Sequence, residues 1–185
     1  PAPAAAALDA GLTLSETGEQ WLAGLLRHAR GMAALCTPTV NGFGRFRPNA
    51  LAPQSVLWGR DNRGAMLRVI GDCGDPGTRI ENRIGEPAAN PYLYMAAQIH
   101  AGLDGLAQRL RAPAATESPY GEAAERLPTS LPEALQALQD DAVLVRGLGA
   151  DFIAYFAQIK ACEIARFDAA ADKEDFQRRE YFARY

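Results

Sequence analysis

Two kinds of hydrophobic periodicity divide this sequence, and together they limit the folds that it can adopt. Between residues 54 and 85, the short segments QSVLWGR, AMLRVIG and RIENRIG have the character of β-strands. The turn-like sequences DNRG and DCGDPG separate them. On both sides of this region, apolar residues recur at helical spacing. The layout predicts an α+β fold in which a small antiparallel sheet is backed by helices.

Capping patterns indicate where several helices begin. Thr13 and Glu16 have capping-box spacing and predict a helix over residues 13–36. The Asn90-Pro91 pair predicts the start of a mostly apolar, and therefore buried, helix over residues 91–111. A second capping box, at residues 130 and 133, opens the next helix, and two more are expected over residues 148–167 and 173–185. The apolar face expected on the helix over residues 148–167 consists of Phe152, Tyr155, Phe156, Ile159 and Phe167.

Composition and cysteine usage exclude several classes of protein. The chain has 185 residues, a net charge of −3 and 48% hydrophobic residues, which is ordinary for one globular domain. No apolar run approaches the roughly 20 residues of a membrane helix. Residues 1–12 lack the basic and apolar parts of a signal peptide, so a flexible lead-in is expected there. Cys36, Cys73 and Cys162 are far apart, which predicts free thiols and a cytoplasmic protein.

Arginines are concentrated around the expected sheet. Residues 41–83 contain seven arginines against four acidic residues, a local charge of +3 in a chain of −3. Such a local excess indicates a bound anionic ligand and argues against a surface for nucleic acid. On a strand, the alternation of Arg79, Glu81 and Arg83 places all three charges on one face. Arginines bind phosphate and carboxylate groups, and a glutamate among them either neutralises them or binds Mg²⁺.

The residues by themselves leave two interpretations of this face open. A solvated edge strand with surface ion pairs would show the same alternation, and the sequence contains no P-loop, HExxH, GxSxG or GxGxxG motif. The other interpretation is a site that holds an anion and a metal ion together. His28 and His100 lie within expected helices, and we expect both to be structural.

Four blocks of sequence resemble the C-terminal part of the glutamine synthetase family. They are NGFGRFRP, RDNRGAMLR, TRIENR and ANPYLYMAAQIHAGLDGL, in the order and with the spacing of the family. The resemblance implies that residues 13–185 are the C-terminal portion of a glutamine synthetase catalytic domain. It also implies that the N-terminal β-grasp domain and the first half of the catalytic domain lie upstream of this chain.

The resemblance implies a role for each matching residue. Arg45 would bind the carboxylate of substrate glutamate. Arg83 would also contact glutamate and, as a catalytic residue, would stabilise the γ-phosphoryl group in transfer. Glu81 would bind a divalent metal ion, Mg²⁺ or Mn²⁺. The residues expected to contact ATP are Arg63, Arg68 and Arg79.

The activity implied is the ATP-dependent joining of glutamate to ammonia or an organic amine through γ-glutamyl phosphate. Leu51 stands where glutamine synthetases carry a glutamate that helps to deprotonate ammonium, which favours a larger amine, as in γ-glutamyl-polyamine ligases. The chain alone is expected to be inactive, and the full-length protein to form a large homo-oligomer of stacked rings. The alternative is a non-catalytic structural or regulatory relative, against which the retained arginines argue.

Overall fold

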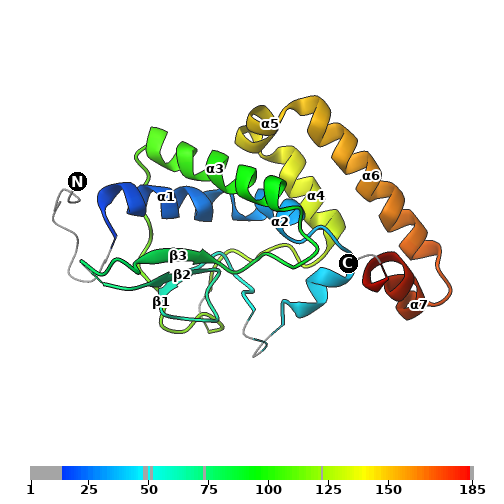
Figure 1. Ribbon diagram of the computed structural model, residues 1–185, viewed down its shortest axis with the longest axis horizontal. Coiled ribbons are helices and arrows are strands. Elements are labelled where there is room, and N and C mark those ends of the chain that lie inside the picture. The colour runs from blue at the N-terminus through cyan, green and yellow to red at the C-terminus, as the bar shows by residue number, and fades with distance from the viewer. Residues whose placement is uncertain (1–13, 48–49, 51, 73, 122, 184–185) are drawn as a thin grey trace.

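The computed structural model describes residues 14–47, 50, 52–72, 74–121 and 123–183. A small sheet lies against two helices, and a further group of helices extends from one end (Figure 1). The described elements are α1 (Glu16–Arg27), α2 (Ala29–Cys36), the 3-10 helix η1 (Asn41–Arg45), β1 (Trp58–Arg60), β2 (Leu67–Ile70), β3 (Arg79–Asn82), α3 (Pro91–Ala107), α4 (Leu131–Asp140), α5 (Ala142–Leu148), α6 (Ala150–Ala169), α7 (Lys173–Gln177) and the π-helical turn η2 (Arg178–Phe182). This arrangement confirms the predicted α+β class.

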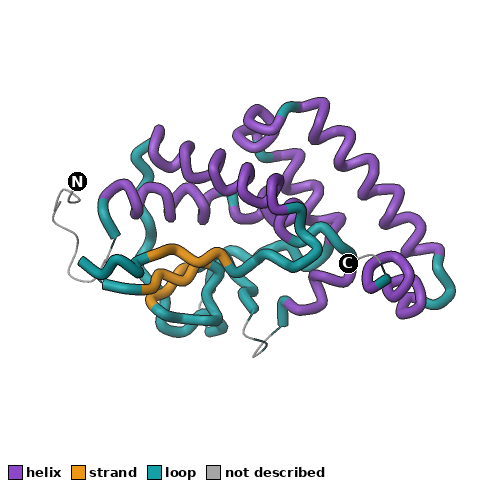
Figure 2. Tube along the Cα trace, viewed as in Figure 1, coloured by secondary structure: helices purple, strands orange, loops and turns teal. Residues whose placement is uncertain are grey.

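The sheet has the order β1-β2-β3 and is mixed, so the prediction of an antiparallel sheet is wrong for its first pair. β2 and β3 are antiparallel, with Arg68 opposite Glu81, whereas β1 and β2 run parallel. Asp61 has a positive φ of 44°, and residues 62–65 form a turn that takes the chain back to the start of β1. Parallel strands normally need a much longer connection, so the short spacing pointed to a hairpin. Figure 2 shows how little of this region is strand and how much is loop.

The helix predicted over residues 13–36 is divided into α1 and α2 at His28. The N-cap of α1 is Ser15, whose Oγ accepts a hydrogen bond of 3.2 Å from the Gly18 amide. Thr13, the cap that was predicted, lies outside the described residues. The apolar stripe of both helices forms the centre of the core, where the largest fully buried side chains include Leu22, Leu25, Met32 and Leu35.

Helices α1 and α3 lie close together because two glycines face each other between them. A Cβ atom at Gly24 would lie 2.2 Å from the carbonyl oxygen of Ala101, and one at Gly105 would lie 2.1 Å from that of Gln20. Both distances are far inside van der Waals contact, and backbone atoms cannot move aside as a flexible side chain does. The glycine pair therefore sets the separation of α1 and α3.

The predicted start of α3 is confirmed, but its predicted burial is wrong. The side chain of Asn90 accepts hydrogen bonds from the amides of Tyr92 and Leu93 and caps the helix. The buried residues of α3 are alanines and glycines, because only small residues fit against α1. The large apolar residues on its opposite side are exposed, namely Tyr92, Met95, Ile99 and Leu103.

The apolar face predicted for α6 is also only partly buried. Phe152 and Phe156 pack against the core, whereas Tyr155 and Ile159 are exposed and Ile153 is buried in their place. Helical spacing identifies an apolar stripe, but the position of the neighbouring helices decides which part of it is covered.

Helices α5 and α6 meet at Gly149, whose φ of 94° breaks the helical path. No single helix among the described residues is long and apolar enough to span a membrane. These two helices reach that criterion only when they are taken together, across a bend of 103°.

His28 joins three parts of the helical layer at the junction of α1 and α2. Its Nδ1 lies 2.7 Å from Asp141 Oδ2, its Nε2 lies 3.0 Å from Asp104 Oδ2, and the ring is buried. Because both ring nitrogens face a carboxylate, the arrangement favours the charged imidazole, in which both nitrogens donate. Burial lowers the pKa of His28, but the two carboxylates outweigh this effect and raise the pKa above its ordinary value. These contacts give His28 the structural role that was expected.

We expect the His28 contacts to make the stability of the fold depend on pH. A raised pKa in the folded state means that the stabilisation is fully present below the unfolded value of about 6.5 and is lost as the pH rises through the folded pKa. The free energy of unfolding in urea should therefore differ most between wild type and His28→Gln near about pH 6, and less near about pH 9. The control variant His100→Gln should show no such change. A difference for His28→Gln that is the same at both pH values would contradict a charged His28.

Candidate active site

Charged side chains from β2, from β3 and from the residues that directly follow β1 and β3 form a connected cluster. Glu81 Oε2 lies 3.0 Å from Arg83 Nη1 and 3.3 Å from Arg68 Nη1, and Arg68 Nε donates a hydrogen bond of 2.9 Å to Asp61. The side chains of Arg68 and Arg83 are only 16% and 18% exposed, compared with 38% for Glu81. We call Asp61, Arg68, Glu81 and Arg83 the sheet cluster. The pairing of β2 with β3 thus places Arg68 opposite Glu81, which also pairs with Arg83, whereas Arg79 lies outside the sheet cluster.

The sheet cluster keeps its carboxylates ionised. Partial burial raises the pKa of Glu81, but the hydrogen bonds and charges of Arg83 and Arg68 outweigh it and hold the pKa below its ordinary value. The hydrogen bond from Arg68 lowers the pKa of Asp61 in the same way. The negative charges of Asp61 and Glu81 therefore offset much of the positive charge of Arg68 and Arg83.

Arg45 approaches the sheet cluster from the 3-10 helix η1. Its Nη2 donates a hydrogen bond of 2.8 Å to the carbonyl oxygen of Arg83, and its guanidinium lies over the ring of Phe46 at 4.9 Å. Its Nε is buried and has no hydrogen-bond partner among the described residues. Burial lowers the pKa of Arg45, an effect that the charge of Glu86 opposes. A buried donor without a partner does not serve stability, which is typical of a position used for binding.

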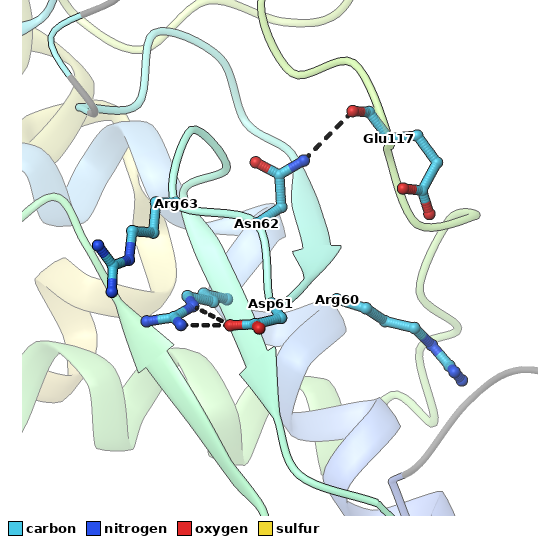
Figure 3. A pocket seen from close by; sticks show the side chains of 6 residues that line it. Arg60, Asp61, Asn62, Arg63 and Glu117 are labelled. Atoms are coloured by element: carbon cyan, nitrogen blue, oxygen red, sulfur yellow. Dashed lines mark hydrogen bonds and ion pairs between the residues drawn. The ribbon is translucent and has the colours of Figure 1, made fainter.

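An open pocket of about 500 Å³ lies beside the sheet cluster. Figure 3 shows Asp61 within it, with Arg63 and Arg60 extending on either side. Arg68, which also lines the pocket, donates a hydrogen bond to Asp61. Two other lining residues contact each other, because Asn62 Nδ2 donates a hydrogen bond of 3.3 Å to the carbonyl oxygen of Glu117. The pocket is within the size range of small-ligand sites, and its three arginines favour an anion.

The structure brings together most of the predicted site residues. Arg45, Arg68, Glu81 and Arg83 are linked by hydrogen bonds, and the carbonyl oxygen of Arg63 accepts a hydrogen bond of 3.0 Å from Arg83 Nε. Arg79 is exposed at the start of β3 and donates to the carbonyl oxygen of Gly77, in its own turn. It still contributes charge to the cluster, since it lowers the pKa of Asp61.

Sequence reasoning did not identify every residue that lines the pocket. Asp61 and Asn62 lie inside the block RDNRGAMLR, so that block was a signal for them. Glu117 reaches the pocket from the loop that follows α3, more than 50 residues away, and no local pattern marks it. Leu51 and Cys73, which were singled out from the sequence, lie outside the described residues.

The described residues do not by themselves fit a bound metal ion. They contain no group of three or more His, Cys, Asp or Glu side chains that could hold one. The carboxylate of Glu81 is also engaged by two arginines. A Mg²⁺ or Mn²⁺ ion at this site would therefore need ligands beyond these residues.

Comparisons with known proteins identify the family of this chain. The family described as "Glutamine synthetase, catalytic domain" matches residues 3–179. A gamma-glutamylanilide synthase from an Acinetobacter species is 43% identical over 182 residues, which are 93% of this chain and 36% of that protein. The glutamine synthetase of Thermus thermophilus is 38% identical over 159 residues, 81% of this chain and 35% of that protein.

The fold matches solved structures equally well. The structure of a complex of GmaS with ADP superimposes with a TM-score of 0.78 at 35% identity, over 95% of this chain and 42% of that chain. This chain spans about a third of the length of the curated relatives that it matches.

Proposed function

We propose that this chain, which belongs to the glutamine synthetase family, is the C-terminal part of an ATP-dependent ligase that joins glutamate to an amine. The observation that carries this proposal is that Arg68 and Arg83 both pair with Glu81 while Arg45 is bonded to the carbonyl oxygen of Arg83. Under this proposal, residues 13–185 are the C-terminal portion of the catalytic domain and the other site residues are supplied by the rest of the protein. The names of the relatives support the reaction class.

Glutamate is assigned to the side of the site that Arg45 and Arg83 form. The bond from Arg45 Nη2 to the Arg83 carbonyl holds this guanidinium against the end of β3. Its partly buried charge would bind the carboxylate of glutamate more strongly than a solvated arginine, because the local dielectric is low.

The nucleotide is assigned to the pocket beside the sheet cluster. Arg63 and Arg68 line it, and Arg79 adds charge nearby. Forked guanidinium groups match the oxygens of a phosphate chain. The presence of ADP in the related GmaS structure supports a nucleotide site in this fold.

The reaction proposed has two steps that balance. The side-chain carboxylate of glutamate takes the γ-phosphoryl group of ATP, which gives γ-glutamyl phosphate and ADP. The amine then attacks the acyl carbon, inorganic phosphate leaves, and the nitrogen gives up a proton to solvent as the amide forms. Arg83 would stabilise the charge on the phosphoryl group during transfer.

A divalent ion would supply further charge neutralisation at the phosphates, with Glu81 as one of its ligands. The described residues do not complete such a site, so its further ligands would come from outside them.

An organic amine is the acceptor that we favour over ammonia. Leu51 offers no carboxylate at the position expected to deprotonate ammonium, and the Acinetobacter relative is named for an anilide product. Assembly into a homo-oligomer and a cytoplasmic location remain predictions from the sequence.

An amine screen tests the proposal. Full-length protein would be given ATP, Mg²⁺ and glutamate, and phosphate release would be followed with ammonia, aniline, alkylamines and polyamines. Release with ammonia alone would identify a glutamine synthetase and contradict the preference drawn from Leu51. Release only with organic amines would support it. No release with any amine, in a correctly assembled protein, would overturn the proposed function and favour a non-catalytic relative.

Substitution of Arg45 should affect the binding of glutamate but not the binding of ATP. In Arg45→Ala, we expect the KM for glutamate to rise by roughly 10- to 100-fold, because a charge-assisted hydrogen bond contributes about 1.5–3 kcal/mol. The KM for ATP should change little, because Arg45 does not line the pocket assigned to the nucleotide. Arg47→Ala, on the same loop but exposed, is the matched control and should behave like wild type. Loss of ATP binding with unchanged use of glutamate would contradict the assigned role.

A further inference from the structure

A glutamate that was not among the predicted site residues holds the segment that carries Arg45. We call residues 37–46 the Arg45 loop. Glu86, in the connection between β3 and α3, accepts hydrogen bonds at Oε1 from the Thr39 amide at 3.0 Å and from the Thr39 hydroxyl at 2.8 Å. The Thr39 hydroxyl in turn accepts a hydrogen bond of 3.1 Å from the Gly42 amide. One carboxylate therefore holds both the start of the loop and the first turn of η1.

The loop and this carboxylate are packed without spare room. A Cβ atom at Gly42 would lie 2.2 Å from Glu86 Oε2, so any larger residue would displace the carboxylate. The same connection is tied to the loop on its other side, where the Thr37 hydroxyl donates a hydrogen bond of 2.6 Å to the Ile84 carbonyl. These contacts leave the Arg45 loop little freedom to shift relative to β3.

Residues of α6 and η2 also hold the Arg45 loop in place. The Val40 amide donates a hydrogen bond of 3.2 Å to Tyr181 Oη, which itself donates to Glu163 at 2.5 Å. Lys160 pairs with Glu163 at 2.8 Å, and its charge also reaches Glu86. The charged groups that act on Glu86 are thus Arg45 on the loop and Lys160 on α6.

Arg45 depends on these contacts for its position. Its described hydrogen bond to the protein runs from Nη2 to the carbonyl of Arg83, and its Nε has no partner among the described residues. Arg83 and Glu86 are three residues apart in the chain. Arg83 accepts the hydrogen bond from the Arg45 guanidinium, and Glu86 accepts the hydrogen bond from Thr39 at the start of the Arg45 loop. A shift of Thr39 relative to Glu86 would therefore move Arg45 away from Arg83.

We propose that Glu86 is a positioning residue, whose hydrogen bonds to Thr39 hold the Arg45 loop and so place the Arg45 guanidinium beside Arg83 to receive a carboxylate substrate. The identity of that substrate as glutamate rests on the proposed function. The placement of Arg45 by Glu86 does not, because the chemical reactivity of Arg45 reports on it without any substrate.

The test removes the hydrogen bonds from either partner in the full-length protein. Glu86→Ala removes the acceptor, Thr39→Val removes the hydroxyl at nearly constant shape, and Thr39→Ser keeps it. For Thr39→Val and Glu86→Ala we expect the KM for glutamate to rise by about tenfold, with the KM for ATP nearly unchanged. Thr39→Ser should restore the wild-type value, which a defect of packing volume alone would not predict.

The chain offers a matched control for lost stability. Thr129 donates its amide and hydroxyl to Glu133 at 2.9 and 3.1 Å, which repeats the Thr39–Glu86 pattern at the start of α4. Thr129→Val should leave the KM for glutamate unchanged. Because Thr129 is exposed and Thr39 is buried, it should also lower the thermal unfolding midpoint less than Thr39→Val does. An equal rise in KM for both variants would overturn the positioning role.

A chemical readout decides the proposal without any activity. The rate at which 2,3-butanedione modifies Arg45, followed by peptide mass spectrometry, should rise severalfold in Thr39→Val and stay constant at the exposed Arg111. Unchanged reactivity of Arg45 would overturn the positioning role of Glu86. Raised reactivity with an unchanged KM for glutamate would support positioning and overturn the assignment of Arg45 to glutamate instead.

Discussion

Substitution of Arg83 by methionine is expected to lower kcat for amine-dependent phosphate release by about a thousandfold, the scale on which an arginine acts in phosphoryl transfer. The contacts that hold the Arg83 guanidinium include those from Nη1 to Glu81 at 3.0 Å and from Nε to the Arg63 carbonyl at 3.0 Å. Its orientation is therefore set before charge develops on the transferred group, which is the condition for effective electrostatic stabilisation. Methionine keeps the length of the side chain but supplies no charge.

The measurement is phosphate release at saturating ATP, glutamate and amine, together with the thermal unfolding midpoint. Arg83→Lys should remain severely impaired, because an ammonium group cannot make both contacts of the guanidinium fork. Arg111→Met is the control, since Arg111 is exposed and pairs with Glu19 on α1, away from the sheet cluster. A kcat for Arg83→Met within about tenfold of wild type would limit Arg83 to substrate binding.

Substitution of Gly105 by valine is expected to lower the free energy of unfolding by roughly 3 kcal/mol, at the upper end of the usual cost of overpacking. The first side-chain carbon would already lie 2.1 Å from the Gln20 carbonyl oxygen. Relief requires α1 and α3 to separate, and that would open the core around Leu22 and Leu25. Because the chain from β3 runs into α3 through Glu86, we also expect the Arg45 loop to be disturbed.

Urea unfolding of wild type, Gly105→Val and Gly121→Ala measures this effect. Gly121 is exposed in a loop, where a Cβ atom would come no nearer than 3.8 Å to its neighbours, so its substitution should be almost neutral. If Gly105→Val unfolds at the same urea concentration as Gly121→Ala, then the close contact between α1 and α3 is not present in solution.

Much of the local structure could be predicted from the sequence. The capping residues Asn90 and Ser130 mark two helix starts correctly, and the three strand segments are found where their patterns place them. The alternation of charge correctly indicates that Glu81 and Arg83 lie together, and Arg68 faces Glu81 from the neighbouring strand, whereas Arg79 bonds within its own turn. The resemblance to the glutamine synthetase family added the roles of the arginines, which remain proposals.

The features that sequence reasoning missed depend on residues distant in the chain. Asp61 turns the chain so that β1 and β2 run parallel, and the loop after α3 brings Glu117 to the pocket. The bonds of His28 to Asp104 and Asp141, and of Thr39 to Glu86, span 47 to 113 residues. No periodicity over a window of ten or so residues carries information on such contacts.

The sequence by itself therefore determined the kinds of elements, their capping and the grouping of positive charge around residues 45–83. Only the tertiary structure decided how β1 pairs with β2, which side of α3 meets the core, and how Arg45 is held beside Arg83. The physical reason is the range of the interactions. Backbone propensity, side-chain periodicity and capping act between near neighbours, whereas strand direction, burial and buried hydrogen bonds are settled only when distant segments come into contact.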